Sequence, residues 1–562
     1  MSPPTLDKFL GEIAQILRDK DGVKLQQYLV YEPPFVPLYQ QMISEIRQVY
    51  GPGSIDALEK KCTSFIPEYD DGLDGGSRAS FITFMVKYFV FLRDLDVTNL
   101  VETHDQLKAL LNQCILALGS SMGLVLLPTV ISLSRTLARL AIGLDKRPEL
   151  IEHLTRREST MGAEEAVERV TLVESSANVI REAFKKCLSE RSGNISGLDN
   201  NGMPEGRRIG IYLTANLCLK LFFHCRKLRS AEQIFGNIYQ QSPPLGLFPA
   251  SQRVTFLYYL GRYLFANSHF YRAQLALQAA YDQCHVRCLS QRRLILIYLI
   301  ASNLILGRFP SAALLRRPEA AGLGEKFAPI CIAIARGDIA SFRKYLDLDS
   351  DKSEWFLRKR ILLQLSNRCE VLIWRSLARR TFLLAGSQGD AINKRAPTLA
   401  LQDMLYLAIY LEKKALEPDP DPSKPSAPTN TQSSNPHTNS IFIFGSNPPS
   451  SSPPSLSSSL RHGYTDPDLL DVVDPSPPIL PTISTIESIV ASLIEQDLLH
   501  GFISHSSHRF AITGAKNASP LQIGGAGVGE GGEEGSCSGG GKFGGGMVVN
   551  LSGARPAGAG PG

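Results

Sequence analysis

The sequence predicts an all-α protein in which a tetratricopeptide-like helical repeat, or α-solenoid, is followed by a winged helix with a small β-hairpin wing. Two observations predict this fold. Residues 161–345 show helical periodicity almost throughout, with a weak internal repeat of about 40 residues. Residues 482–513 change from an apolar period of about 3.6 to a period of about 2, which indicates a helix followed by a hairpin.

Residues 1–160 predict an N-terminal helical region, with helices over 5–30, 38–65 and 78–157. Within it, residues 109–134 carry no charge and are long enough to span a bilayer. Polar residues and a Gly-Ser-Ser break at Gly119 interrupt this stretch, so we expect two buried helices there and no membrane partner.

Residues 161–352 predict the helical repeats themselves. Each copy has the apolar spacing of a helical hairpin, which buries its face only by stacking on the next copy. The central copy has Leu257, Leu260, Gly261, Leu264, Ala273, Leu277 and Ala280, the upstream copy Leu219, Phe222, Ala231 and Phe235, and the downstream copy Ala301, Leu304 and Ala313.

Residues 353–415 and 482–515 together predict the winged helix. The first part reads as a basic helix pair, 353–366 and 369–384, with a third helix from 398 to 414. Between the two parts, the Pro/Ser-rich insertion 416–481 is expected to be disordered, as is the Gly-rich tail 516–562. An insertion in a surface loop adds little closure entropy, so the two parts can still pair.

The second part of the winged helix has a helix start and a hairpin of its own. Ser484 and Glu487 have the S-x-x-E spacing of a capping box. The hairpin is predicted around Ser506 and Ser507, between strands at 501–505 and 509–512. One buried stripe is expected on the helix, from Ile486, Ile489, Val490, Leu493 and Ile494.

Positive charge is concentrated in one part of the chain. The whole chain carries a formal net charge of +5, but residues 354–395 alone hold nine Lys or Arg against three acids, whereas residues 416–481 hold seven acids against two bases. Several cations on one surface suit phosphate binding, although a solvated face or acidic protein partners would use the same residues. The candidate nucleic-acid contacts are Arg358, Lys359, Arg360, Arg375, Arg379, Arg380, Lys394, Arg395 and, on the wing, Arg509.

Arg375 and Arg379 are four residues apart and share one helical face, with Arg380 adjoining, while Ile373, Leu377 and Leu384 are expected to face the core.

The predicted recognition helix carries the wrong charge for reading DNA. Residues 483–497 contain Glu487, Glu495 and Asp497 and no Lys or Arg. Acids in a major groove would face phosphates, so this helix is expected to pack or to contact protein. The wing is mildly basic, and His505 and His508 read as exposed turn residues.

No sequence motif indicates catalysis, a cofactor or a metal site. Phosphate-binding, zinc-protease and nucleophile-elbow motifs are missing, so no enzyme is predicted. Cys284, His285 and Cys288 form one cluster, but a zinc site needs a second pair of ligands. The ten cysteines are scattered and the start of the chain lacks signal-peptide features, which predicts a reducing cytosolic or nuclear location.

With these features in place, the chain resembles the PCI family, named for the proteasome lid, the signalosome and an initiation factor. The likeness covers about residues 205–415 and 482–515, and it resembles most the branch of PCI domain-containing protein 2 and the fungal signalosome subunit 12-like proteins. The segments that carry it are 251–285, 292–310, 372–384 and 482–512.

The resemblance implies a non-catalytic PCI subunit of the nuclear transcription-export complex, acting in mRNA export coupled to transcription. It implies a larger PCI partner subunit, a small acidic subunit, and sequence-independent contact with RNA or double-stranded DNA. The expected location is the nucleus, with the cytoplasm as a second compartment. Two alternatives stay open: a subunit of a signalosome, proteasome-lid or initiation-factor assembly, and a DNA-binding transcription regulator.

Overall fold

The computed structural model describes residues 4–51, 53–67, 75–120, 123–150, 171–190, 198–199, 202–348, 350–389, 396–416 and 481–512. Contacts divide the chain into two compact units. The first unit comprises Met1–Asn303 with Pro318–Ala320, and the second comprises Leu304–Arg317 with Ala321–Gly562. The insertion and tail predicted at 416–481 and 516–562 lie almost wholly outside the described residues. The predicted domain boundaries stay predictions.

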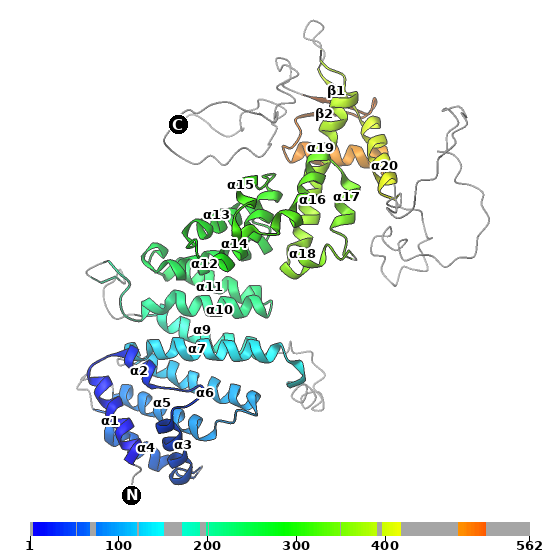
Figure 1. The fold of residues 1–562 in the computed structure, drawn as a ribbon. Coiled ribbons are helices and arrows are strands. Elements are labelled where there is room, and N and C mark those ends of the chain that lie inside the picture. Colours follow the sequence, from blue (N-terminus) through cyan, green and yellow to red (C-terminus); the bar gives the residue numbers. More distant parts are fainter. Residues whose placement is uncertain are drawn as a thin grey trace, which may run out of the picture. The chain divides into compact units, whose positions relative to one another are not determined.

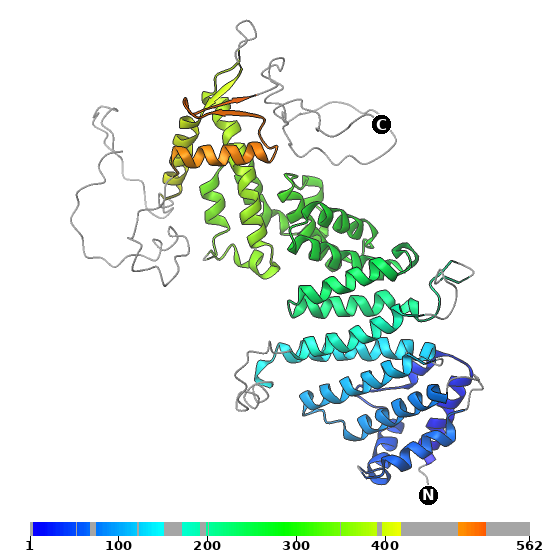
Figure 2. The same ribbon diagram turned by 180° about the vertical axis from the view of Figure 1, so that it is seen from behind.

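The described part of the first unit is helical. Its helices lie side by side in successive layers, so that α5, α6, α7, α9 and α10 each pack on the next (Figures 1 and 2). They are α1 (Pro4–Arg18), α2 (Gly22–Tyr28), α3 (Pro37–Val49), α4 (Ile55–Phe65), α5 (Gly75–Asp94), α6 (Leu100–Leu118), α7 (Gly123–Asp145), η1 (Pro148–Leu150), α9 (Leu172–Leu188), η2 (Gly206–Gly210), α10 (Ile211–His224), α11 (Leu228–Gln241), η3 (Leu245–Leu247), α12 (Ala250–Ala266), α13 (Phe270–Gln283), α14 (Leu289–Ile305) and η4 (Pro318–Ala320).

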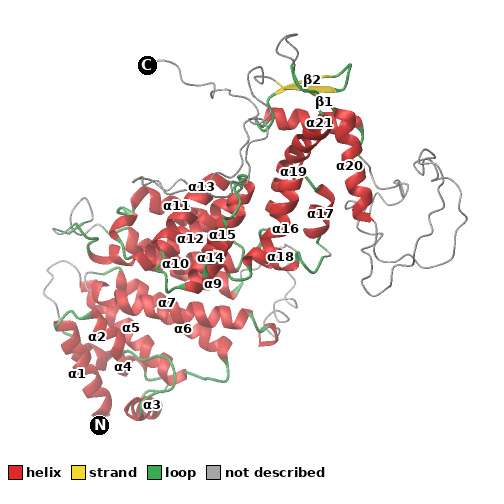
Figure 3. Ribbon diagram, turned by 45° about the horizontal axis from the view of Figure 1, so that its top comes forward, coloured by secondary structure: helices red, strands yellow, loops and turns green. Residues whose placement is uncertain are grey.

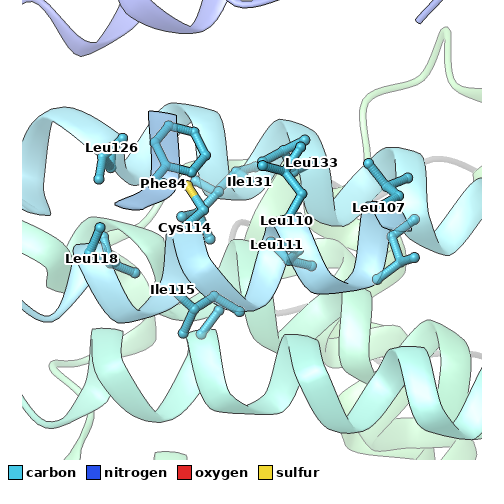
Figure 4. Close-up of a cluster of buried hydrophobic side chains, with 14 of the residues drawn as sticks. Phe84, Leu107, Leu110, Leu111, Cys114, Ile115, Leu118, Leu126, Ile131 and Leu133 are labelled. Atoms are coloured by element: carbon cyan, nitrogen blue, oxygen red, sulfur yellow. The ribbon is translucent and has the colours of Figure 1, made fainter. Parts of the chain in front are cut away.

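The core of this unit is continuous across these layers. Leu110, Cys114 and Leu118 of α6 are fully buried, and Figure 4 shows them beside Leu133 of α7 and Phe84 of α5. Each large apolar side chain that is fully buried contributes about 1.5–3 kcal/mol. The unit is therefore stabilised mainly by apolar packing between neighbouring helices.

The uncharged stretch at 109–134 forms the end of α6 and the first half of α7, as its Gly-Ser-Ser break predicts. Among the described residues, α7 is the one helix long and apolar enough to cross a membrane, judged by length and composition alone. Its most apolar window is 61% buried inside the protein. The buried core helix of a globular protein has the same character.

The predicted repeat corresponds to two complete helical hairpins, α10–α11 and α12–α13. A Cβ on Gly261 of α12 would lie 2.5 Å from Cγ of Leu277 on α13, so the absence of a side chain there allows the close helix contact. The face of α12 differs from the prediction, because Phe256 and Phe265 are buried and Leu257 is only half-buried.

The third repeat copy is incomplete. Ala301 and Leu304 are buried on α14, but the second helix of this copy shrinks to the four-residue α15, where Ala313 is exposed. The weak sequence signal at this copy therefore does not produce a full hairpin.

The second unit contains the winged helix. Figure 3 shows its strands gathered at one end of the helices. Its elements are α15 (Ala312–Leu315), α16 (Leu323–Arg336), α17 (Ile339–Tyr345), α18 (Glu354–Lys359), α19 (Leu362–Ala385), β1 (Thr398–Ala400), α20 (Leu401–Leu416), α21 (Ile483–Glu495), β2 (Gly501–Ser504) and β3 (Arg509–Ile512).

The wing has three strands, in the order β1-β3-β2, all antiparallel. The hairpin predicted from sequence is confirmed as β2 and β3. The prediction of a helix starting at Thr398 is wrong for its first three residues, because Thr398–Ala400 pairs with β3 before the helix begins. The chain thus runs α19, β1, α20, α21, β2, β3, and α20 packs on α21 across the insertion.

The predicted break in the basic helix pair is also wrong. Instead of ending near residue 366, the first helix ends at Lys359, because Arg360 takes a left-handed backbone conformation with φ of 57°. The second helix, α19, then runs unbroken from Leu362 to Ala385.

The start of α21 differs from the predicted capping box. Thr482, not Ser484, is the N-cap residue: its backbone is extended and its hydroxyl accepts a hydrogen bond from the backbone N–H of Thr485 at 3.3 Å. Glu487 does not bond back to the helix start but faces the wing. The stripe prediction holds for Ile486, Val490 and Leu493, whereas Ile489 and Ile494 are half-buried.

Candidate nucleic-acid interface

The predicted basic residues form two separate groups, one just before α19 and one near its end. Arg358, Lys359 and Arg360 precede the helix, while Arg375 and Arg380 belong to its last three turns. At a rise of about 1.5 Å per residue, the first group and Arg375 are roughly 20 Å apart along the axis. A phosphate backbone can contact both groups only by running along the helix.

One of the cations that precede α19 forms an ion pair with a neighbouring residue. Arg358 forms an ion pair with Glu354 at 3.2 Å, one helical turn before it. Both side chains are well exposed, so this pair is worth little to stability. Arg360 is exposed and Lys359 is half-buried.

The cations at the end of α19 differ in burial. Arg375 and Arg379 are half-buried, and Arg380 is exposed. Burial lowers the pKa of Arg375, and the neighbouring charge of Arg379 lowers it further. The prediction that Leu384 faces the core is wrong, because its side chain is 72% exposed near the end of α19.

Arg380 also holds α19 against α16. Its Nη1 donates to the backbone carbonyl of Arg336 at 3.3 Å. That carbonyl belongs to the last turn of α16, where a cation offsets the negative end of the helix dipole. This contact brings the exposed Arg336 next to the basic end of α19, although the sequence reading had not included Arg336.

The wing reaches the same end of α19. Arg379 lines a small apolar hollow together with Phe510 of β3. Arg509, the preceding residue, is exposed at the start of β3. The wing arginine therefore lies at the same end of the unit as Arg379 and Arg380, whereas Lys394 and Arg395 lie outside the described residues.

The wing contacts an acidic side chain of α21. The carboxylate of Glu487 lies 3.1 Å from Nδ1 of His508 and 3.5 Å from Nδ1 of His505. The hydrogen bond from His508 is the largest cause that lowers the pKa of Glu487. The two histidines thus contact α21 through Glu487. Within the described residues, no cluster of His, Cys, Asp or Glu could hold a metal ion.

Comparison with known proteins gives relatives of one kind. A PCI domain-containing protein of Schizosaccharomyces pombe is 33% identical over 224 residues, which cover 40% of this chain and 48% of the relative. A protein named CSN12 homolog from Neurospora crassa is 29% identical over 224 residues, covering 39% and 46%. PCI domain-containing protein 2 of Xenopus laevis is 25% identical over 213 residues, covering 38% and 49%.

These relatives support placing the chain in the PCI domain family. The chain spans about half the length of the curated relatives it matches. No protein-family model matches the chain. The names of the relatives point to the branch of PCI domain-containing protein 2 and the CSN12 homologs. The observed helical layers and three-stranded winged helix are consistent with that branch.

The candidate interface consists of Arg375, Arg379 and Arg380 of α19 together with Arg509 of β3. Sequence reasoning found these four residues, but it grouped them with the distant α18 cations. It missed Arg336, whose only sequence signal is a basic last turn ahead of Gly337. It also missed Arg368, which is exposed midway along α19 between the two groups.

Proposed function

We propose that this PCI protein is a non-catalytic scaffold subunit of a nuclear complex that couples transcription to mRNA export. In this role it docks partner proteins and contacts RNA or DNA without sequence preference. The observation that carries the proposal is the winged helix whose basic residues come from α19 and β3 and not from α21. Such a surface meets phosphates but does not place side chains against base edges.

Docking of a larger PCI partner is supported by the edge of the wing. Among the described residues, β2 is one of the two edge strands beside β3, and Phe502 on it is 58% exposed. An edge strand with an exposed aromatic side chain suits pairing with another sheet. We propose that a second winged helix pairs here, and that a small acidic subunit completes the complex.

Charge reversal tests the nucleic-acid contact. Arg375 and Arg379 are poor sites for this test, because their half-buried side chains would also change folding. Replacing Arg380 and Arg509 together by Glu should weaken binding to random RNA and to duplex DNA. The plot of log K against log salt has a negative slope, and each lost phosphate contact should make this slope shallower by about 1. Fluorescence anisotropy at several salt concentrations measures both the affinity and its salt dependence.

The control is Lys87→Glu, which makes one such charge reversal at an exposed position of α5 in the first unit. It should leave the salt slope unchanged. An unaltered slope in the double variant, with thermal unfolding like that of the wild type, would reject the assignment of these arginines.

A second candidate function is a subunit of a signalosome-type assembly, favoured by the relatives named CSN12 homolog. Purification of the tagged protein with its partners distinguishes the two candidate functions. A large PCI partner with a small acidic subunit supports the export complex. Recovery of isopeptidase subunits instead supports the signalosome and rejects the export proposal.

A further inference from the structure

Four helices of the second unit enclose a cleft of about 370 Å³. This volume lies within the range of about 300–1,000 Å³ that is typical of ligand sites. Its walls come from α17, α19, α20 and α21, and Pro481, the last residue of the predicted insertion, also lines it. The cleft is separate from the basic end of α19 and has no part in the proposed nucleic-acid contact.

The bottom of the cleft is apolar and its rim is polar. Trp374 and Leu493 are buried at the bottom, and Ile489 is half-buried beside them. Ser488 and Ser492 of α21 are exposed and four residues apart, so their hydroxyls lie along one edge. An apolar side chain entering the cleft would lose contact with water, while its backbone could bond to these hydroxyls.

The cleft also holds more negative than positive charge. Arg343 forms ion pairs with Glu370 at 2.6 Å and with Glu412 at 3.7 Å, and Nε1 of Trp374 donates to Glu370 at 3.2 Å. Two carboxylates thus share one guanidinium. Glu412 is only 21% exposed, and burial raises its pKa although the charge of Arg343 opposes this. An additional cation beside Glu412 would therefore be favourable.

We propose that this cleft binds a peptide segment of a partner protein in which Lys or Arg stands next to a bulky apolar residue. The cation would join Arg343 between Glu370 and Glu412, and the apolar side chain would pack on Trp374. Charge complementarity selects this partner, because an acidic segment or a phosphate backbone would be repelled by the surplus carboxylate.

The chain's own insertion is a poorer occupant. It leaves α20 a few residues after Glu412 and returns at Pro481, so it is close to the cleft along the chain. However, residues 416–481 hold seven acids and two bases. This charge is of the same sign as the surplus charge in the cleft, which favours a separate, basic partner.

A peptide array tests the proposal on the full-length chain. The probes are heptapeptides with a central Arg flanked by Leu, Ile, Phe, Trp or Tyr, each with a counterpart in which neutral citrulline replaces Arg. The best Arg peptides should bind at least tenfold more tightly than their counterparts in solution. Glu412→Gln should reduce this preference to less than threefold, and Ser488→Trp, which fills the cleft, should abolish binding.

Two controls keep the outcome interpretable. Glu495→Gln, on the exposed part of α21, should bind like the wild type, and so should the Arg380→Glu, Arg509→Glu double variant, which separates this site from the nucleic-acid proposal. If no Arg peptide is preferred over citrulline, or if Ser488→Trp binds normally, the proposal is rejected.

Other occupants give different results. If no Arg peptide is preferred by the full-length chain, but binding appears after residues 417–480 are replaced by a Gly-Ser linker, the insertion is the occupant. Self-association that is lost in Ser488→Trp would identify a second copy of the chain. Either result overturns the proposal of a basic partner segment.

Discussion

At the scale of single residues, the role of a charged side chain depends on its contacts in the fold. Glu487 looked like an unfavourable acid on a recognition helix, yet its carboxylate is bound by two histidines of the wing turn. The sequence contained all three residues, but not the pairing. That pairing depends on how the turn 505–508 folds back on α21, where His508 has a positive φ of 48°.

We predict that Glu487 contributes to stability in a pH-dependent way. Its pKa in the folded protein lies below its ordinary value of 4.5. The folded state therefore gains stability from this carboxylate above that value, and loses it as the pH falls through the lowered pKa. Thermal unfolding of Glu487→Gln should differ from that of the wild type at neutral pH, and the difference should shrink below pH 4.5.

Glu495→Gln is the matched control, since Glu495 is an exposed acid on the same helix. Its effect should be small at every pH. A difference between wild type and Glu487→Gln that stays constant down to pH 3 would contradict the assigned contact with the histidines.

At the scale of elements, sequence reasoning succeeded where a signal was local and long, and failed at short or non-local features. The helix at 483–495 and the two wing strands were predicted from periodicity alone. Strand β1 was not, because its three residues become a strand only by pairing with Phe510 and its neighbours, over a hundred residues later. The end of α18 was misplaced because nothing near Arg360 signals its left-handed backbone.

At the start of α21, the predicted N-cap residue is only two positions from the observed one. Thr482 and Ser484 are both suitable N-cap residues and lie two positions apart. The S-x-x-E pattern favoured Ser484, but Glu487 is held by the wing and cannot bond back to the helix start. Long-range contacts therefore decided a choice that local rules left nearly balanced.

We predict that Thr482→Ala lowers the free energy of unfolding of the second unit by about 0.5–2 kcal/mol, the usual value of an N-cap hydroxyl. Ser484→Ala should change it by only a few tenths of a kcal/mol, because Ser484 lies inside the helix and is exposed. Chemical denaturation of both variants measures the difference. A larger loss in Ser484→Ala than in Thr482→Ala would restore the capping-box assignment.

At the scale of the whole molecule, the fold class could be predicted because helical periodicity and the change of period near the end of the chain are properties of the sequence itself. The candidate interface could be predicted only in part. Net charge located the arginines of α19, but the length of that helix separates them from the α18 cations. Only tertiary contact brought Arg336 to Arg380, and Phe510, the neighbour of Arg509, to Arg379.

The arrangement of the winged helix leads to a last prediction, that it survives a cut in its insertion. The segment after the insertion supplies the central strand β3, which pairs with β1 and β2. It also supplies Ile486, Val490 and Phe510, which are all buried. At about 1.5–3 kcal/mol for each buried apolar side chain, the attraction between the two parts is on the order of several kcal/mol before the sheet is counted.

A recognition sequence for a site-specific protease, placed after Ser450, allows the cut to be made in the folded protein. The two fragments should elute together in gel filtration and separate only in urea. Val490→Asp places a charge in the buried stripe of α21, so in this control variant the cut should release the C-terminal fragment. Separation of the wild-type fragments without denaturant would show that the insertion itself, and not the packing of α21 and β3, holds the winged helix together.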